Sequence, residues 1–363
     1  MVIQSSAVSP PVAERSVAEP SVAELSTTEP SAIGVVLDLI EAIGRVPTGR
    51  TATVGLGEAH RSVALDLVAA WCASSGNEIV SVEGLTVTVL HGRSPDPLAG
   101  LDPAQLPGTR VWVYTNFDCN LSCDYCCVRS SPKAERRAIG AERLQRIASE
   151  AAAAGVGELI LTGGEPFLLN DIDTLVNSCT DELPTTLLTN GMLFRGARLE
   201  RLRRMDRSRL TLQVSVDSAT AGIHDSHRGA GSWAKAVNGI RIAHEEGFRV
   251  KVAATLPADQ MHELEPFHAF LDTIGVSRED QVIRALAHRG VADSGIELTV
   301  DSLIPEVTIT ADGVYWHPVA ADHDDQFVTR DIFPLADAIA EITRRFVAHR
   351  RAADSIAEWF PCA

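Results

Sequence analysis

Three of the four cysteines in one short segment are the residues best suited to chemistry: Cys119-Asn120-Leu121-Ser122-Cys123-Asp124-Tyr125-Cys126-Cys127. Cys119, Cys123 and Cys126 follow at offsets of four and three residues, after an apolar run at 111–114 that is typical of a strand. Such a loop can wrap three thiolates around one iron–sulfur cluster. Because four cysteines normally hold such a cluster, three leave one iron open to another ligand. The alternatives are a zinc knuckle, for which a distant second cysteine pair is missing, or cysteines that only pack.

The pattern Cys119-x-x-x-Cys123-x-Tyr125-Cys126 resembles the signature of the radical S-adenosylmethionine (radical SAM) superfamily. The resemblance implies one 4Fe-4S cluster on these cysteines, with SAM on the open iron and Tyr125 beside the cofactors. It implies that an electron from a flavodoxin- or ferredoxin-type reductant cleaves SAM to methionine and a 5′-deoxyadenosyl radical, which abstracts hydrogen from a substrate. Cys127 is interpreted as a packing residue or as one that faces the substrate.

Polar and glycine-rich motifs follow the next predicted strands. By the same resemblance, Gly163-Gly164-Glu165-Pro166 holds the SAM amino group, and Ser215 and Asp217 contact the SAM ribose or carboxylate, with Asn190 near them. Arg228 would pair with the SAM carboxylate, because a guanidinium binds a carboxylate as a fork.

Each of these motifs also has a purely structural interpretation. Pro166 can start a helix after a simple turn, and Asn190 with Gly191 is a common turn pair. Arg228 can be a surface arginine in a loop.

Alternating strands and helices must position these residues. The apolar runs predict strands at 110–115, 157–162, 185–189, 210–216, 248–255 and 280–286, with helices at 140–154, 170–180, 197–205, 232–246 and 261–274. Such β-α repeats indicate an α/β fold with a parallel sheet and functional groups at the carboxyl ends of the strands. Six units fit the partial (β/α)6 TIM barrel of the resembled family, over residues 109–295.

Two segments precede the predicted barrel. Residues 1–30 are rich in Ser, Ala, Glu and Pro and predict a disordered tail. Residues 31–95 predict helix, strand, helix, strand, strand, which resembles the two-layer α/β sandwich of the TusA/SirA sulfur carriers. The carrier cysteine of that family has no counterpart at 30–34, and Cys72 is predicted to lie in the core, so docking of a protein partner or a structural role is expected. Residues 96–108, rich in Pro and Gly, predict a linker.

Residues 296–363 predict a hairpin, at 307–310 and 314–316, and a final helix from about 335 to 350. This arrangement resembles the twitch or SPASM extension of radical SAM enzymes. His317 stands where that family commonly has a cysteine ligand to an auxiliary cluster, and Cys362 is the only cysteine that follows. We therefore expect a single cluster, and leave open whether His317 or Cys362 binds metal.

Composition excludes several other classes of protein. Asp and Glu number 48 against 32 Lys and Arg, a net charge of −16, which argues against nucleic-acid and anionic-membrane partners. No apolar run is long enough for a membrane span, and no secretory signal is recognisable. Seven clustered cysteines argue against a disulfide framework, so a cytoplasmic protein is expected.

The predicted function is therefore that of a radical SAM enzyme. A peptide or protein substrate ranks first and a small metabolite second. Sulfur-related radical chemistry, with the N-terminal domain used for docking, is a further alternative. A zinc or iron–sulfur scaffold protein is the non-enzymatic one.

Overall fold

The computed structural model describes residues 21–22, 31–92, 98 and 101–359, which belong to two compact units. One unit comprises residues 1–99 and 350–363, and the other comprises residues 100–349. Within the segment predicted to be a tail, β1 (Ser21–Val22) pairs in parallel with β2. The rest of that segment and Cys362 lie outside the described residues.

The N-terminal unit has the predicted order of elements. These are α1 (Ala32–Arg45), β2 (Thr51–Gly55), α2 (Arg61–Ser75), β3 (Glu78–Glu83) and β4 (Thr86–Leu90), with the strands in the order β1-β2-β4-β3. Val35 and Leu39 of α1 and Val68 of α2 share one core with the inward side chains of β2 and β4. Cys72 is 4% exposed in this core, as predicted, and burial raises its pKa to about 11. The helices therefore form one layer over the sheet.

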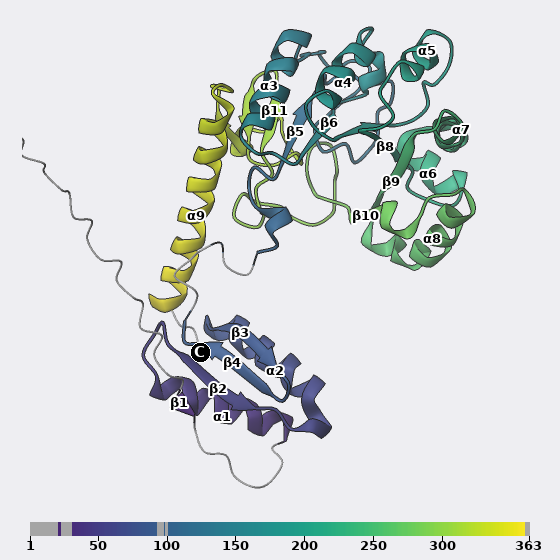
Figure 1. The fold of residues 1–363 in the computed structure, drawn as a ribbon. Helices are drawn as coiled ribbons and strands as arrows, with labels where there is room; N and C mark the ends of the chain where they lie inside the picture. Colours follow the sequence, from purple (N-terminus) through teal and green to yellow (C-terminus); the bar gives the residue numbers. More distant parts are fainter. Residues whose placement is uncertain (1–20, 23–30, 93–97, 99–100, 360–363) are drawn as a thin grey trace, which may run out of the picture. The chain divides into compact units, whose positions relative to one another are not determined.

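Six parallel strands form the centre of the second unit (Figure 1). They are β5 (Arg110–Tyr114), β6 (Glu158–Thr162), β7 (Thr185–Thr189), β8 (Leu210–Ser215), β9 (Arg249–Leu256) and β10 (Gln281–Ala285). Each differs from its predicted range by at most one residue at either end. Their neighbours follow the chain order from β5 to β10, as expected when each crossover helix returns the chain to the same sheet. The sheet is consistent with a partial barrel.

Helices alternate with these strands as the sequence predicts, with one exception. The predicted helices are α3 (Ala141–Ala153), α4 (Ile172–Thr180), α5 (Ala197–Arg203), α7 (Ser232–Glu245) and α8 (Leu264–Thr273). The exception is α6 (Ala221–Arg228), where the sequence predicted no helix. It has only 8 residues, too few to show a clear period, and it places Arg228 in its last turn rather than in a loop.

The C-terminal hairpin joins the barrel sheet. Strands β11 (Thr308–Thr310) and β12 (Gly313–Tyr315) form the predicted hairpin, β13 (Phe327–Thr329) pairs with β12, and α9 (Leu335–Trp359) follows. However, β11 pairs in parallel with β5, so one sheet of nine strands runs from β10 to β13. None of the helices in the described ranges has the length and apolar character that crossing a membrane requires.

Candidate active site

A cavity of about 240 Å³ opens at the carboxyl ends of the parallel strands. The predicted site residues that line it are Cys119, Cys123, Tyr125, Cys126, Gly163, Gly164, Asn190, Ser215 and Arg228. Three other predicted site residues, Glu165, Pro166 and Asp217, are buried next to it and do not line it. The fold thus brings together segments separated by more than a hundred residues, because parallel strands end at one edge of the sheet.

The cysteine loop begins directly after β5 and turns back on itself. The amide of Leu121 donates to Cys119 Sγ at 3.4 Å, and the amide of Ser130 donates to Cys126 Sγ at 3.3 Å. Such amide–sulfur hydrogen bonds tune iron–sulfur clusters in proteins. Burial raises the pKa of Cys119 to about 12 and that of Cys123 to about 11, so these thiols need a cationic ligand to ionise at neutral pH.

The three thiols of the loop lie on the wall of one cavity. In the part of the chain that the structure describes, no three His, Cys, Asp or Glu side chains lie close enough to bind one metal ion. In an iron–sulfur cluster each cysteine ligates a different iron, so three cysteines on one cavity are compatible with such a cluster.

The two glycines after β6 allow the cysteine loop to pack closely. A Cβ on Gly164 would lie 2.2 Å from the carbonyl oxygen of Asp118, and one on Gly163 would lie 2.7 Å from that of Asn116. The amide of Gly164 donates to the Asn116 carbonyl at 2.9 Å. Glycine is therefore required here for contact between two backbones, besides leaving the cavity wall open.

The carboxylate of Glu165 connects the loop after β6 to the end of β7. Its carboxylate accepts hydrogen bonds from the amide of Phe167 at 3.0 Å, the hydroxyl of Thr189 at 2.8 Å and the amide of Asn190 at 2.8 Å. Burial raises the pKa of Glu165, and these hydrogen bonds offset part of that shift. Pro166 follows at the start of a short 3-10 turn, as the structural interpretation of the sequence expected.

Asp217 and Arg228 form a buried ion pair beside the cavity. Arg228 Nη2 donates to Asp217 Oδ1 at 3.1 Å, and Arg228 Nε donates to Oδ2. The hydroxyl of Tyr125 also donates to Asp217, and the amide of Thr255 donates to it at 3.2 Å. Burial alone would raise the pKa of Asp217, but the charge and hydrogen bonds of Arg228 hold it below its usual value. The sequence predicted that Arg228 pairs with the SAM carboxylate. In the structure its guanidinium is hydrogen-bonded to Asp217.

Helix α6 adds a residue that sequence reasoning did not select. His224 is 1% exposed, and its Nδ1 accepts a hydrogen bond from the backbone amide of Asp217 at 3.2 Å. Burial lowers its pKa to about 4, so the imidazole is neutral at pH 7. His224 lies seven residues after Asp217, and this spacing alone did not predict that the two residues are in contact.

The segment after β10 closes one side of the cavity, which no sequence pattern indicated. A Cβ on Gly290 would lie 2.0 Å from the carbonyl of Cys126, and the amide of Val291 donates to that carbonyl at 3.0 Å. Arg284, at the end of β10, lines the cavity as well. The cysteine loop is therefore packed between the loops that follow β6 and β10.

The sequence left the roles of Cys127 and His317 open, and the structure shows what surrounds each side chain. Cys127 lines the cavity and packs against the apolar cluster of Tyr114, Phe117 and Val128. His317 accepts a hydrogen bond at Nδ1 from the amide of Val319 at 3.1 Å, and burial lowers its pKa to about 4.

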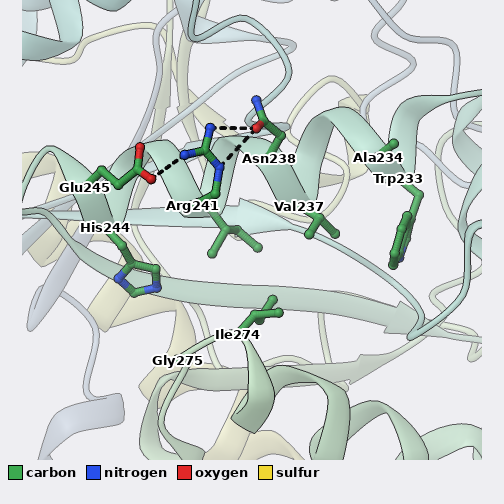
Figure 2. A pocket seen from close by; sticks show the side chains of 10 residues that line it. Trp233, Ala234, Val237, Asn238, Arg241, His244, Glu245, Ile274 and Gly275 are labelled. Atoms are coloured by element: carbon green, nitrogen blue, oxygen red, sulfur yellow. Dashed lines mark hydrogen bonds and ion pairs between the residues drawn. The ribbon is translucent and has the colours of Figure 1, made fainter.

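A second hollow lies on the outer side of the barrel and is unrelated to the cysteines. This groove, of about 600 Å³, runs between α7 and α8 and is lined by Trp233, Val237 and Ile274, among others. Figure 2 shows Arg241 bridging Asn238 and Glu245 along its rim. The groove is mainly apolar, and three of its polar side chains, Asn238, Arg241 and Glu245, are joined by hydrogen bonds.

One family model matches the part of the chain that contains most of this site. Residues 113–274 match the family model described as "Radical SAM superfamily". The matched residues cover less than half of the chain and include all three cysteines of the loop. The cofactors characteristic of that superfamily are SAM and a 4Fe-4S cluster.

Two curated relatives are similar over part of their length. An "AdoMet-dependent heme synthase" from Methanosarcina barkeri is 30% identical over 44% of this chain and 45% of its own. The "Antilisterial bacteriocin subtilosin biosynthesis protein AlbA" of Bacillus subtilis is 31% identical over 40% of this chain and 33% of its own. The chain thus spans less than half the length of these relatives. They carry the names of biosynthetic proteins, and the superfamily is one of enzymes.

Among solved structures, native anSMEcpe with bound AdoMet has a TM-score of 0.50. The sequences are 13% identical, over 66% of this chain and 82% of that one. At this identity the similarity concerns the fold.

Proposed function

We propose that this chain is a radical SAM enzyme that modifies a peptide, with its cluster on Cys119, Cys123 and Cys126. The observation that carries the proposal is the convergence of these three cysteines on one cavity at the ends of the parallel strands. The match of residues 113–274 to the superfamily supports it. When bound, a 4Fe-4S cluster and SAM supply electron transfer and radical chemistry.

The residues of the chain would hold and orient these groups. The amides of Leu121 and Ser130 stabilise the sulfurs of Cys119 and Cys126 as thiolates. Gly163, Gly164, Asn190 and Ser215 offer backbone and polar side-chain groups to SAM from three strand ends.

The ion pair between Asp217 and Arg228 fixes Tyr125, and with it the end of the cysteine loop. Asp217, Glu165 and Pro166 act as positioning residues in this proposal, because they do not line the cavity. A flavodoxin- or ferredoxin-type protein would supply the electron.

The peptide is preferred over a small metabolite because of the similarity to AlbA, whose name refers to bacteriocin biosynthesis. The similarity to the heme synthase favours the small metabolite as second candidate. Sulfur-related chemistry has less support, because Cys72, the one cysteine among the described residues of the N-terminal unit, is in its core.

A protein partner at the N-terminal unit is part of the proposal. Ile33, Leu37 and Ile40 are 67%, 61% and 43% exposed along one side of α1. Large apolar side chains at helical spacing on an exposed face are typical of protein contacts. The TusA-like interpretation of this unit stays a prediction, with docking as its expected role.

Anaerobic reconstitution with iron and sulfide tests the proposal. We expect iron–sulfur absorbance and, with SAM and dithionite, the formation of 5′-deoxyadenosine. The Cys123→Ala variant should lose both, because two thiolates cannot replace the full ligand set. Its neighbour in the same loop provides the matched control: Cys127→Ala should retain iron. A Cys123→Ala variant that still forms 5′-deoxyadenosine would refute the assignment of the cluster.

A further inference from the structure

The cavity contains one charged side chain that has no hydrogen-bond or ion-pair partner among the residues that the structure describes. Among the described residues that line it, the charged ones are Arg228 and Arg284. Asp217 neutralises Arg228 through two hydrogen bonds. Arg284 forms neither a hydrogen bond nor an ion pair through its side chain within the described residues.

Arg284 is exposed at the cavity, and the acid that acts on it is already engaged by other side chains. The nearest acid, Glu306, is engaged by Arg110 Nη2 at 3.0 Å and by the indole N–H of Trp112. Burial lowers the pKa of Arg284, and Glu306 offsets only part of that shift. The side chain is nevertheless accessible, because it faces the open space of the cavity. A guanidinium stays ionised in proteins, so its donors are available to a bound anion.

We propose that Arg284 binds a carboxylate of the substrate at the end of the cavity formed by β10 and the loop that follows it. This inference rests on the proposed function and names the substrate class: a molecule with a free carboxylate close to the atom that reacts. A planar guanidinium matches a carboxylate in shape and in donor spacing.

The walls around Arg284 favour a single negative charge. Ala285, Leu286 and Ala287 follow it along the chain, and Val319 lines the same cavity. These side chains are apolar and add no second cation. One guanidinium balances one carboxylate, whereas a phosphate dianion would remain half neutralised. For a peptide substrate, the group is an acidic side chain or the C-terminus.

Matched small probes test this inference on the reconstituted protein with SAM bound. The probes are N-acetyl-L-alanine, its neutral amide N-acetyl-L-alaninamide, and methyl phosphate, each measured by titration. We expect the carboxylate to bind about tenfold more tightly than the amide, the value of one charge-assisted hydrogen bond. Arg284→Gln should abolish this preference and Arg284→Lys should keep part of it. Arg241→Gln, in the outer groove, should behave as the wild type.

Each other outcome contradicts the inference in an identifiable way. Equal binding of carboxylate and amide to the wild type, or an unchanged preference in Arg284→Gln, would overturn it. Tighter binding of methyl phosphate would overturn the carboxylate assignment. A parallel loss of SAM affinity in Arg284→Gln would assign Arg284 to the cofactor instead. If the wild type forms no 5′-deoxyadenosine, the proposed function fails, but the probes still report on Arg284 because they measure binding.

Discussion

Glu165 and Asp217 are two buried carboxylates at the same edge of the sheet, held in opposite ways. Within the described residues, the carboxylate of Glu165, after β6, accepts hydrogen bonds from neutral backbone and hydroxyl donors, and burial raises its pKa. Asp217, after β8, faces the guanidinium of Arg228, which holds its pKa down. One region is therefore a neutral network around a carboxylate, and the other is an ion pair.

The difference indicates what each region does for the cysteine loop. The donors to Glu165 come from the loops after β6 and β7, so it ties two strand ends together. Asp217 joins β8 to α6 through Arg228 and to the cysteine loop through Tyr125. An unpaired buried charge costs more than a changed neutral hydrogen bond, so the Asp217 region should be the more sensitive to substitution.

Asp217→Asn should have the largest effect on stability. It leaves Arg228 buried and unpaired, and we expect the free energy of unfolding to fall by about 3–5 kcal/mol. Denaturant unfolding of the metal-free protein measures this. The double variant with Arg228→Gln should lose less than the sum of the two single variants. A loss below about 1 kcal/mol would show that the pair is not as buried as the structure has it.

Glu165→Gln should have a smaller effect. The side chain keeps its volume and can still accept at one oxygen, but its new amide group faces the donors of Thr189 or Asn190. We expect a loss of about 1–3 kcal/mol in the same unfolding measurement. A loss larger than that of Asp217→Asn would reverse the order of the two regions.

The stability losses of Asp217→Asn and Glu165→Gln should also depend on pH. This is the smallest of the expected effects, and it separates the two regions best. A raised pKa means that folding opposes ionisation of Glu165, so its contribution to stability decreases as the pH rises from about 4.3 through the folded pKa. The difference in the free energy of unfolding between the wild type and Glu165→Gln should therefore increase as the pH falls from 7 to about 4.5. For Asp217 the pKa is lowered, so its contribution is complete above about 3.9 and is lost only below that.

Unfolding curves for wild type and both variants at several pH values would check this contrast. Parallel changes of the two gaps between pH 7 and 4.5 would contradict it. The effect is small because each difference in unfolding free energy changes only through the titration of one carboxyl group.

The sequence was informative where local pattern decides structure. The six strands were predicted within one residue because continuous apolar runs are typical of buried parallel strands. Cys119, Cys123 and Cys126 were selected because their spacing is a local pattern, and the structure places all three on one cavity. Helix α6 was missed because eight residues show little periodicity, and with it the neutral His224.

The sequence by itself thus determined the alternation of strands and helices and the composition of the cysteine loop. Only the tertiary structure decided which polar groups face the cavity. It placed Gly164 against Asp118 and paired Arg228 with Asp217, and it left Arg284, near the end of β10, without a side-chain partner among the described residues. The physical reason is that a hydrogen bond or ion pair depends on distances between residues far apart in the chain, and only the packed sheet fixes those distances.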